Sequence, residues 1–66
     1  MGYSTYSEKL ESLVYFVKSR SATNVNELTR KLEVSRRTVL RMIDALRVKG
    51  INIQYSYKDK KYFIED

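Results

Sequence analysis

The stretch that decides the fold is Val34–Leu46, which reads VSRRTVLRMIDAL. Its apolar residues recur at the spacing of one face of an α-helix, and Ser35 is a typical residue for the position just before a helix. Gly50 follows a few residues later, where a helix of this pattern is expected to stop. The stretch therefore predicts an amphipathic helix over about residues 36–49.

The charged residues of this helix allow two interpretations. With Val39 at 0° on a helical wheel, Ile43 and Leu46 fall within about 40° of it and form an apolar stripe. Arg37 and Arg41 fall at about 160° and 200°, on the opposite side. Arginines in this arrangement usually lie on a solvated face, yet a pair that points away from a core can also enter a groove of DNA. The neighbouring segments have to decide between the two.

A first helix is predicted over about residues 7–19. Ser7 can act as its N-cap, and the apolar stripe that contains Leu10 is extended by Tyr6 one turn earlier. Tyr15 lies off this stripe.

A second, short helix is predicted over about residues 25–32. Its start is similar to a capping box, because Asn24 is followed three residues later by Glu27. The very short turn Leu32–Ser35 would set this helix at a steep angle to the next one. That is the helix-turn-helix geometry, in which the second helix of the pair can enter the major groove of DNA.

After Gly50 the apolar residues alternate with polar ones, which is the period of a β-strand. The two β-prone segments on either side of the polar break at residues 58–60 predict a hairpin over about residues 51–65. Tyr62 and Ile64 are expected to face inward, although a slip of one residue would turn Phe63 inward instead. Three tyrosines are expected to pack in the hairpin and the core rather than to stack on bases: Tyr55, Tyr57 and Tyr62.

Length and composition limit what the chain can be. Its 66 residues suffice for a single domain over residues 1–66, of the α+β class, with a three-helix core and a terminal hairpin. It contains no cysteine and no histidine, the residues that most metal sites and many active sites use. An enzyme is therefore a poor interpretation, and no cofactor, metal site or small-molecule pocket is predicted.

The net charge of +5 is distributed unevenly along the chain. Residues 1–29 hold three basic and three acidic side chains, whereas residues 30–61 hold ten basic and three acidic ones. A basic second half favours a polyanionic partner such as DNA, although basic residues also keep a small protein soluble.

The sequence shows no targeting or membrane segment. Its first residues lack the apolar region of a signal peptide and the pattern for myristoylation, and no apolar run has the length of a membrane span. The cytoplasm is therefore the expected compartment, and no membrane partner is expected. The oligomeric state stays open, with a homodimer among the options.

The run from Asn24 to Gly50 resembles the winged helix-turn-helix domain at the N-terminus of biotin-ligase repressors and of deoxyribose-regulator-type transcription repressors. The pattern that carries the resemblance is N-x-x-E-L…L-x-V-S-R-R-T-V-x-R-x-I-D-A-L-R-x-x-G-I-x-I. With the first helix and the hairpin, the resemblance covers nearly the whole chain. It implies sequence-specific binding of double-stranded DNA by a transcription regulator. The third helix would lie in the major groove, and the hairpin, or wing, would lie on an adjacent groove or on phosphates.

The resemblance also places individual residues at the DNA. Arg37 and Arg41 can pair with guanine, and Arg36, which flanks the apolar stripe, is better placed for a phosphate. Ser35 and Thr38 can bind a phosphate together with the free amides of the helix N-terminus. The lysines of the wing tip can contact phosphates as well, or protect the hairpin edge from pairing with another chain. The predicted DNA-binding residues are Ser35, Arg36, Arg37, Thr38, Leu40, Arg41, Lys58, Lys60 and Lys61.

Several positions depart from the family pattern. Glu33 takes a turn position that is usually glycine, which costs about 1–2 kcal/mol if the backbone there is left-handed. Leu40 and Met42 replace residues that are commonly polar. Met42 is expected at the edge of the core, whereas Leu40 can touch a thymine methyl group, rest on the wing or be exposed. The wing tip is rich in lysine where the family often has glycine.

Two alternatives stay open. In the first, the chain is a winged-helix module that docks a protein through its wing or through exposed apolar residues such as Tyr15, Leu40 and Phe63. In the second, it is the regulatory DNA-binding arm of a larger enzyme.

Overall fold

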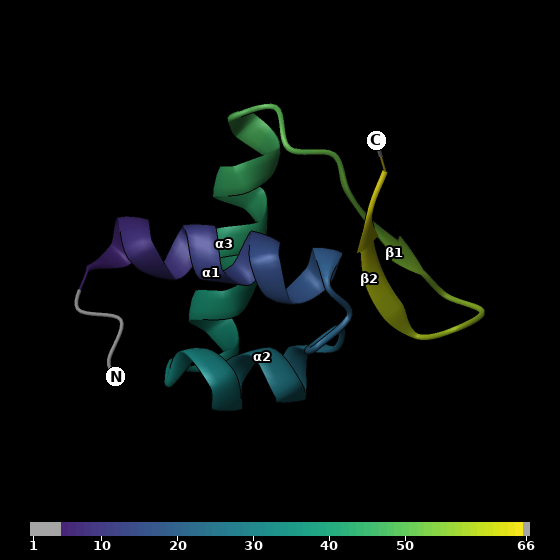
Figure 1. Cartoon of the computed structure of the whole chain (residues 1–66), viewed down its shortest axis with the longest axis horizontal. Helices are drawn as coiled ribbons and strands as arrows, with labels where there is room; N and C mark the ends of the chain where they lie inside the picture. The colour runs from purple at the N-terminus through teal and green to yellow at the C-terminus, as the bar shows by residue number, and fades with distance from the viewer. Residues whose placement is uncertain (1–4, 66) are drawn as a thin grey trace.

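Three helices and a two-stranded antiparallel hairpin make up the computed structural model, which describes residues 5–65 (Figure 1). The predicted α+β class and the predicted order of elements are confirmed. The domain predicted over residues 1–66 extends past the described residues at both ends. Along the chain, the elements are α1 (Tyr6–Lys18), α2 (Val25–Leu32), α3 (Arg36–Val48), β1 (Ile53–Ser56) and β2 (Lys61–Ile64).

α1 begins one residue earlier than predicted, because its N-cap is Thr5 and not Ser7. The Thr5 hydroxyl accepts a hydrogen bond from the Glu8 amide, and the Glu8 carboxylate accepts one from the Thr5 amide, both at 3.1 Å. This reciprocal capping box satisfies two main-chain donors, which a serine cap alone would not do. The prediction that Tyr6 belongs to the apolar stripe is wrong as well, since its side chain is 51% exposed.

α2 has the predicted bounds, and its ends explain the turn that follows. Asn24 accepts a hydrogen bond of 2.8 Å from the Glu27 amide, whereas the Glu27 carboxylate accepts from the amide of Thr23 rather than that of Asn24. At the other end, Glu33 has the left-handed values φ 57° and ψ 45°. This conformation turns the chain so that α3 begins only three residues later, at Arg36.

A Schellman motif ends α3 at Gly50, whose φ is 99°. The Gly50 amide donates to the Arg47 carbonyl at 3.0 Å, and the Ile51 amide donates to the Leu46 carbonyl at 2.9 Å. Gly50 therefore stops the helix as predicted. Because the Ile51 amide serves this cap, the first strand begins at Ile53 rather than at residue 51.

The hairpin confirms the predicted facing of its second strand. The paired residues are Ile53–Ile64, Gln54–Phe63, Tyr55–Tyr62 and Ser56–Lys61. Tyr62 and Ile64 pack against the core, and Phe63 points outward with 42% of its side chain exposed. The Tyr62 amide donates a hydrogen bond of 2.8 Å to the carbonyl of Thr23, and this bond attaches β2 to the loop between α1 and α2.

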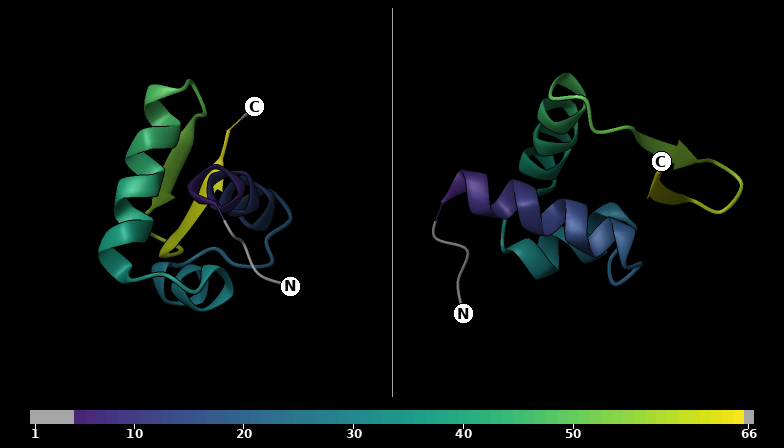
Figure 2. Two further views of the ribbon diagram at one scale, coloured as in Figure 1. Left: turned by 90° about the vertical axis from the view of Figure 1, so that its left-hand side faces the viewer. Right: turned by 45° about the horizontal axis from the view of Figure 1, so that its top comes forward.

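The core lies among the three helices and the inward face of the hairpin. β2 contacts α1 and β1 contacts α3, so the hairpin separates these two helices at one end of the molecule (Figure 2, left). Met42 is fully buried, and the prediction that it lies at the edge of the core is therefore wrong. The buried core residues are Leu10, Leu13, Val17, Ala22, Leu28, Leu32, Val39, Met42, Ile43, Leu46 and Ile53.

Candidate nucleic-acid interface

The outward surface of α3 carries three arginines. Arg36, Arg37 and Arg41 are all exposed, whereas the opposite side of the helix is buried in the core. Arg37 and Arg41 are four residues apart, so their guanidinium groups lie on one exposed surface. No carboxylate of the described residues forms a salt bridge with any of the three. These charges are therefore free to meet an anionic partner.

Ser35 and Thr38 hold the start of this helix. The Ser35 hydroxyl accepts a hydrogen bond of 3.2 Å from the Thr38 amide, and the two hydroxyl oxygens are 3.0 Å apart. The main chain of the helix begins its own bonding with the Val39 amide, which donates to the Ser35 carbonyl. The amides of Arg36 and Arg37 precede that bond, so they are the donors that an anion can reach at this end.

Leu40 lies on the same side as the arginines. It is 44% exposed and does not pack against the core. Arg36 and Arg37 precede it by four and three residues, so its side chain is their neighbour on the helix surface. The structure thus places one apolar group among the exposed guanidinium groups.

The tip of the hairpin presents the three predicted lysines. Lys58, Lys60 and Lys61 are all exposed, and Lys60 has a left-handed φ of 57°. The turn is held by Ser56, whose hydroxyl accepts a hydrogen bond of 3.2 Å from the Asp59 amide. The Asp59 carboxylate is the one acidic group in this loop and lies 3.5 Å from the same hydroxyl.

Arg47 connects α3 to the hairpin, a role that the sequence did not reveal. Its Nε donates a hydrogen bond of 3.0 Å to the Ile53 carbonyl, in a partly buried position. A longer ion pair of 3.7 Å joins it to Asp44. Arginine in the last turn of a helix is common for electrostatic reasons alone, so the sequence offers no sign of this contact.

A row of tyrosines runs along the inward face of the hairpin. The ring centroids of Tyr62 and Tyr55 are 4.8 Å apart, and those of Tyr55 and Tyr57 are 5.0 Å apart, both in edge-on geometry. Burial raises the pKa of Tyr62, and the positive charges of Arg47 and Arg36 partly offset that rise. Tyr57 was expected to pack, and it does touch Tyr55, but 85% of its side chain is exposed.

Residues 9–57 match the sequence model of a family described as the HTH, or helix-turn-helix, domain. The chain belongs to the helix-turn-helix domain family. The family is a DNA-binding one and not a catalytic one, and its members serve in transcription regulation. No curated protein and no solved structure matches the chain. The resemblance to biotin-ligase repressors and deoxyribose-regulator-type repressors in particular is not tested by this match and stays a prediction.

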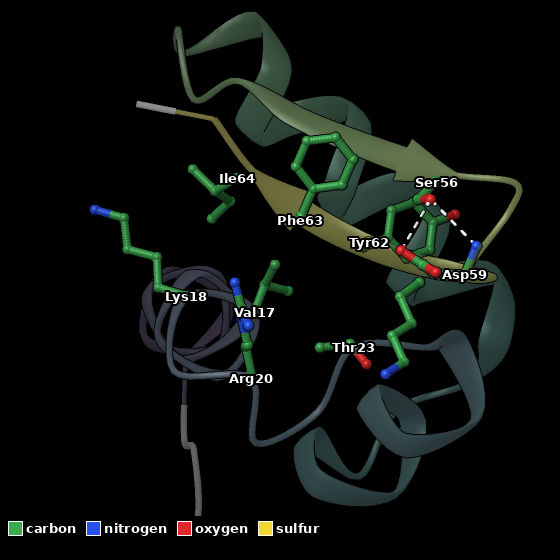
Figure 3. Close-up of a pocket in the computed structure, with 10 residues that line it drawn as sticks. Val17, Lys18, Arg20, Thr23, Ser56, Asp59, Tyr62, Phe63 and Ile64 are labelled. Carbon is green, nitrogen blue, oxygen red and sulfur yellow. Dashed lines mark hydrogen bonds between the residues drawn. The ribbon is translucent and has the colours of Figure 1, made fainter.

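The helix-turn-helix domain also has a groove of about 780 Å³ between the end of α1 and the edge of β2 that does not pair with β1 (Figure 3). Lys18 and Arg20 come from α1 and the loop after it, while Phe63 and Ile64 come from β2. Among the predicted DNA-binding residues, Lys61 alone lines this groove. The sequence predicted no pocket, because the segments that form the groove lie far apart along the chain.

The exposed apolar residues of the helix-turn-helix domain that the sequence singled out lie on separate elements. Tyr15 is 64% exposed on α1, Leu40 lies on α3, and Phe63 borders the groove beside β2. Tyr15 and Leu40 are therefore on different helices, and neither packs against the core. Within residues 5–65, no helix is apolar over the length that crossing a membrane requires.

Proposed function

We propose that this helix-turn-helix domain binds double-stranded DNA sequence-specifically as part of a transcription regulator, with α3 in the major groove and the wing on the phosphate backbone. The observation that carries the proposal is the pair Arg37 and Arg41, exposed and without a carboxylate partner among the described residues. An arginine fork matches the O6 and N7 acceptors of guanine, and each good pairing discriminates by about 1–3 kcal/mol.

The remaining site residues would have two roles: most would position the domain on the phosphate backbone, and one would contact a base. Arg36 and the amides at the start of α3 would hold a phosphate, which fixes the register of the helix on the duplex. Leu40 would contact a thymine methyl group beside the bases that the arginines read. The lysines of the wing tip would add salt-sensitive phosphate contacts: Lys58, Lys60 and Lys61.

The proposal is tested first by selecting bound sequences from a random duplex library. Fluorescence anisotropy then compares a selected duplex with a random one at two salt concentrations. We expect saturable binding that weakens as salt rises, because each neutralised phosphate releases counterions. A palindromic selected site would support a homodimer on the DNA, since half-sites mirror the symmetry of a dimer. Absence of binding at low salt would contradict DNA binding and favour a protein-docking module.

The groove assignment is tested with Arg37→Ala combined with Arg41→Ala. This variant should lose the preference for the selected duplex by about tenfold or more, while its circular dichroism stays helical. The matched control is Lys9→Ala with Lys18→Ala, which removes the same charge from α1. The control should weaken binding to both duplexes slightly and keep the preference. If the double arginine variant keeps the preference too, α3 does not read the bases.

A further inference from the structure

The tyrosine row of the hairpin ends in Tyr57, whose ring does not pack against the core. Tyr62 is half-buried and packs against the core, and Tyr55 lies against Tyr62. Tyr57 extends the row by one more edge-on contact, yet 85% of its side chain faces solvent. Such a contact fixes an aromatic ring at little conformational cost, because tyrosine has only two side-chain torsions to restrict.

The row lies on the same side of the hairpin as α3. Ile53 begins the inward face of β1, and its carbonyl accepts the hydrogen bond from Arg47 of α3. Arg47 lies in the last turn of α3, so this bond holds the inward face of β1, with Tyr55 and Tyr57 on it, beside that helix. Tyr57 continues this face beyond the core, toward the lysines of the tip.

We propose that Tyr57 is a further DNA-contacting residue of the wing, whose ring lies against the sugar and base edges of the minor groove next to α3. The inference rests on the proposed function. It adds a non-ionic contact to the ionic contacts of the lysines beside it. Once α3 fills the major groove, the adjacent minor groove is the nearest surface with apolar walls, and side chains that enter it are often large and apolar.

The surroundings of Tyr57 favour DNA over an apolar protein surface. Lys58, Lys60 and Lys61 follow it in the next four positions, interrupted by Asp59, and are all exposed. A ring among cations suits a partner with anionic edges and flat apolar faces, and DNA offers both. Phe63 also has cations beside it, but they line the groove between α1 and β2, to which α3 contributes no residue. Tyr15 lies on α1.

A salt series of anisotropy titrations on the selected duplex separates the ring from the charges. Tyr57→Ala should weaken binding by about fivefold or more at every salt concentration, and leave the slope of log affinity against log salt unchanged. Lys58→Ala should instead lower that slope by about one phosphate contact. Tyr57→Phe keeps the ring and should bind within about twofold of the parent. Tyr15→Ala removes an exposed tyrosine from α1 and should bind as the parent does.

The outcomes distinguish this inference from the proposed function. If the parent binds the duplex and Tyr57→Ala binds equally well, Tyr57 makes no contact and only the inference fails. A changed salt slope in Tyr57→Ala, with thermal unfolding unchanged from the parent, would also overturn it, because the loss would then be ionic. If Tyr57→Phe is as weak as Tyr57→Ala, the hydroxyl and not the ring makes the contact, and the inference is again wrong. If the parent itself does not bind, the proposed function fails first.

Discussion

Three residues other than glycine adopt left-handed backbone conformations in the described part of the chain. Arg20 has φ 63°, Glu33 has φ 57° and Lys60 has φ 57°. Each lies directly after a helix or at the hairpin tip, where a glycine would be the ordinary choice. Glu33 matters most for function, because the turn it makes sets the angle between α2 and α3.

Glu33→Gly is expected to stabilise the domain by about 0.5–1 kcal/mol. Relief of about 1–2 kcal/mol of left-handed strain exceeds the loss of about 0.5–1 kcal/mol that comes from the more flexible unfolded chain. Urea unfolding followed by circular dichroism measures the change. Lys49→Gly is the control, because Lys49 caps α3 with an ordinary φ of −77° and should lose stability instead. Equal effects at both positions would show that Glu33 carries no strain.

Helical spacing predicted most of the residue environments, and its errors have physical causes. It placed Arg37 and Arg41 on the exposed side and Val39 in the core, as the structure confirms. It misjudged Met42, because α3 is covered from more than one direction and buries a wider stripe than a single partner helix would. It expected Tyr57 to pack, but the strand alternation continues past the last residue that has a core to face.

At the scale of elements, α3 and the wing are joined by contacts that the sequence did not predict. Capping residues and hydrophobic periodicity predicted the helix bounds to within one residue. The Thr5 capping box was missed, although Thr5 and Glu8 have the sequence spacing of such a box. The bond from Arg47 to the Ile53 carbonyl, in contrast, links a helix to a strand across the Schellman turn. No local pattern specifies which carbonyl an arginine at a helix end will reach.

Arg47→Met is expected to destabilise the domain by about 1 kcal/mol. The methionine keeps much of the apolar stem but removes the guanidinium group that donates to Ile53, a bond whose net worth is about that size. Thermal or urea unfolding gives the value. Lys49→Met, two residues further along at an exposed position, should stay within about 0.5 kcal/mol of the parent. If both variants unfold alike, the Arg47 bond contributes nothing to holding the wing.

At the scale of the whole molecule, the uneven distribution of charge along the chain places most of the basic side chains on two elements, α3 and the wing. The basic second half forms α3 and the wing, whereas the electrically balanced first half forms α1 and the start of α2. The sequence could predict this because the halves fold as successive elements. It could not predict the groove beside β2 or the bond from Tyr62 to Thr23, since both depend on contacts between the first and last parts of the chain.

The attachment of β2 to the rest of the domain sets its minimal folding unit. The family match ends at residue 57, before β2 begins, yet β2 supplies Tyr62 and Ile64 to the core and the amide that bonds to Thr23. A fragment that ends at residue 57 should therefore lose its cooperative thermal transition and expose Ile53, although it keeps all of α3. Thermal circular dichroism and amide proton dispersion would show this, and an unchanged melting temperature would contradict it. Boundaries for dissecting this protein or grafting its domain onto another should follow the hairpin and not the extent of family likeness.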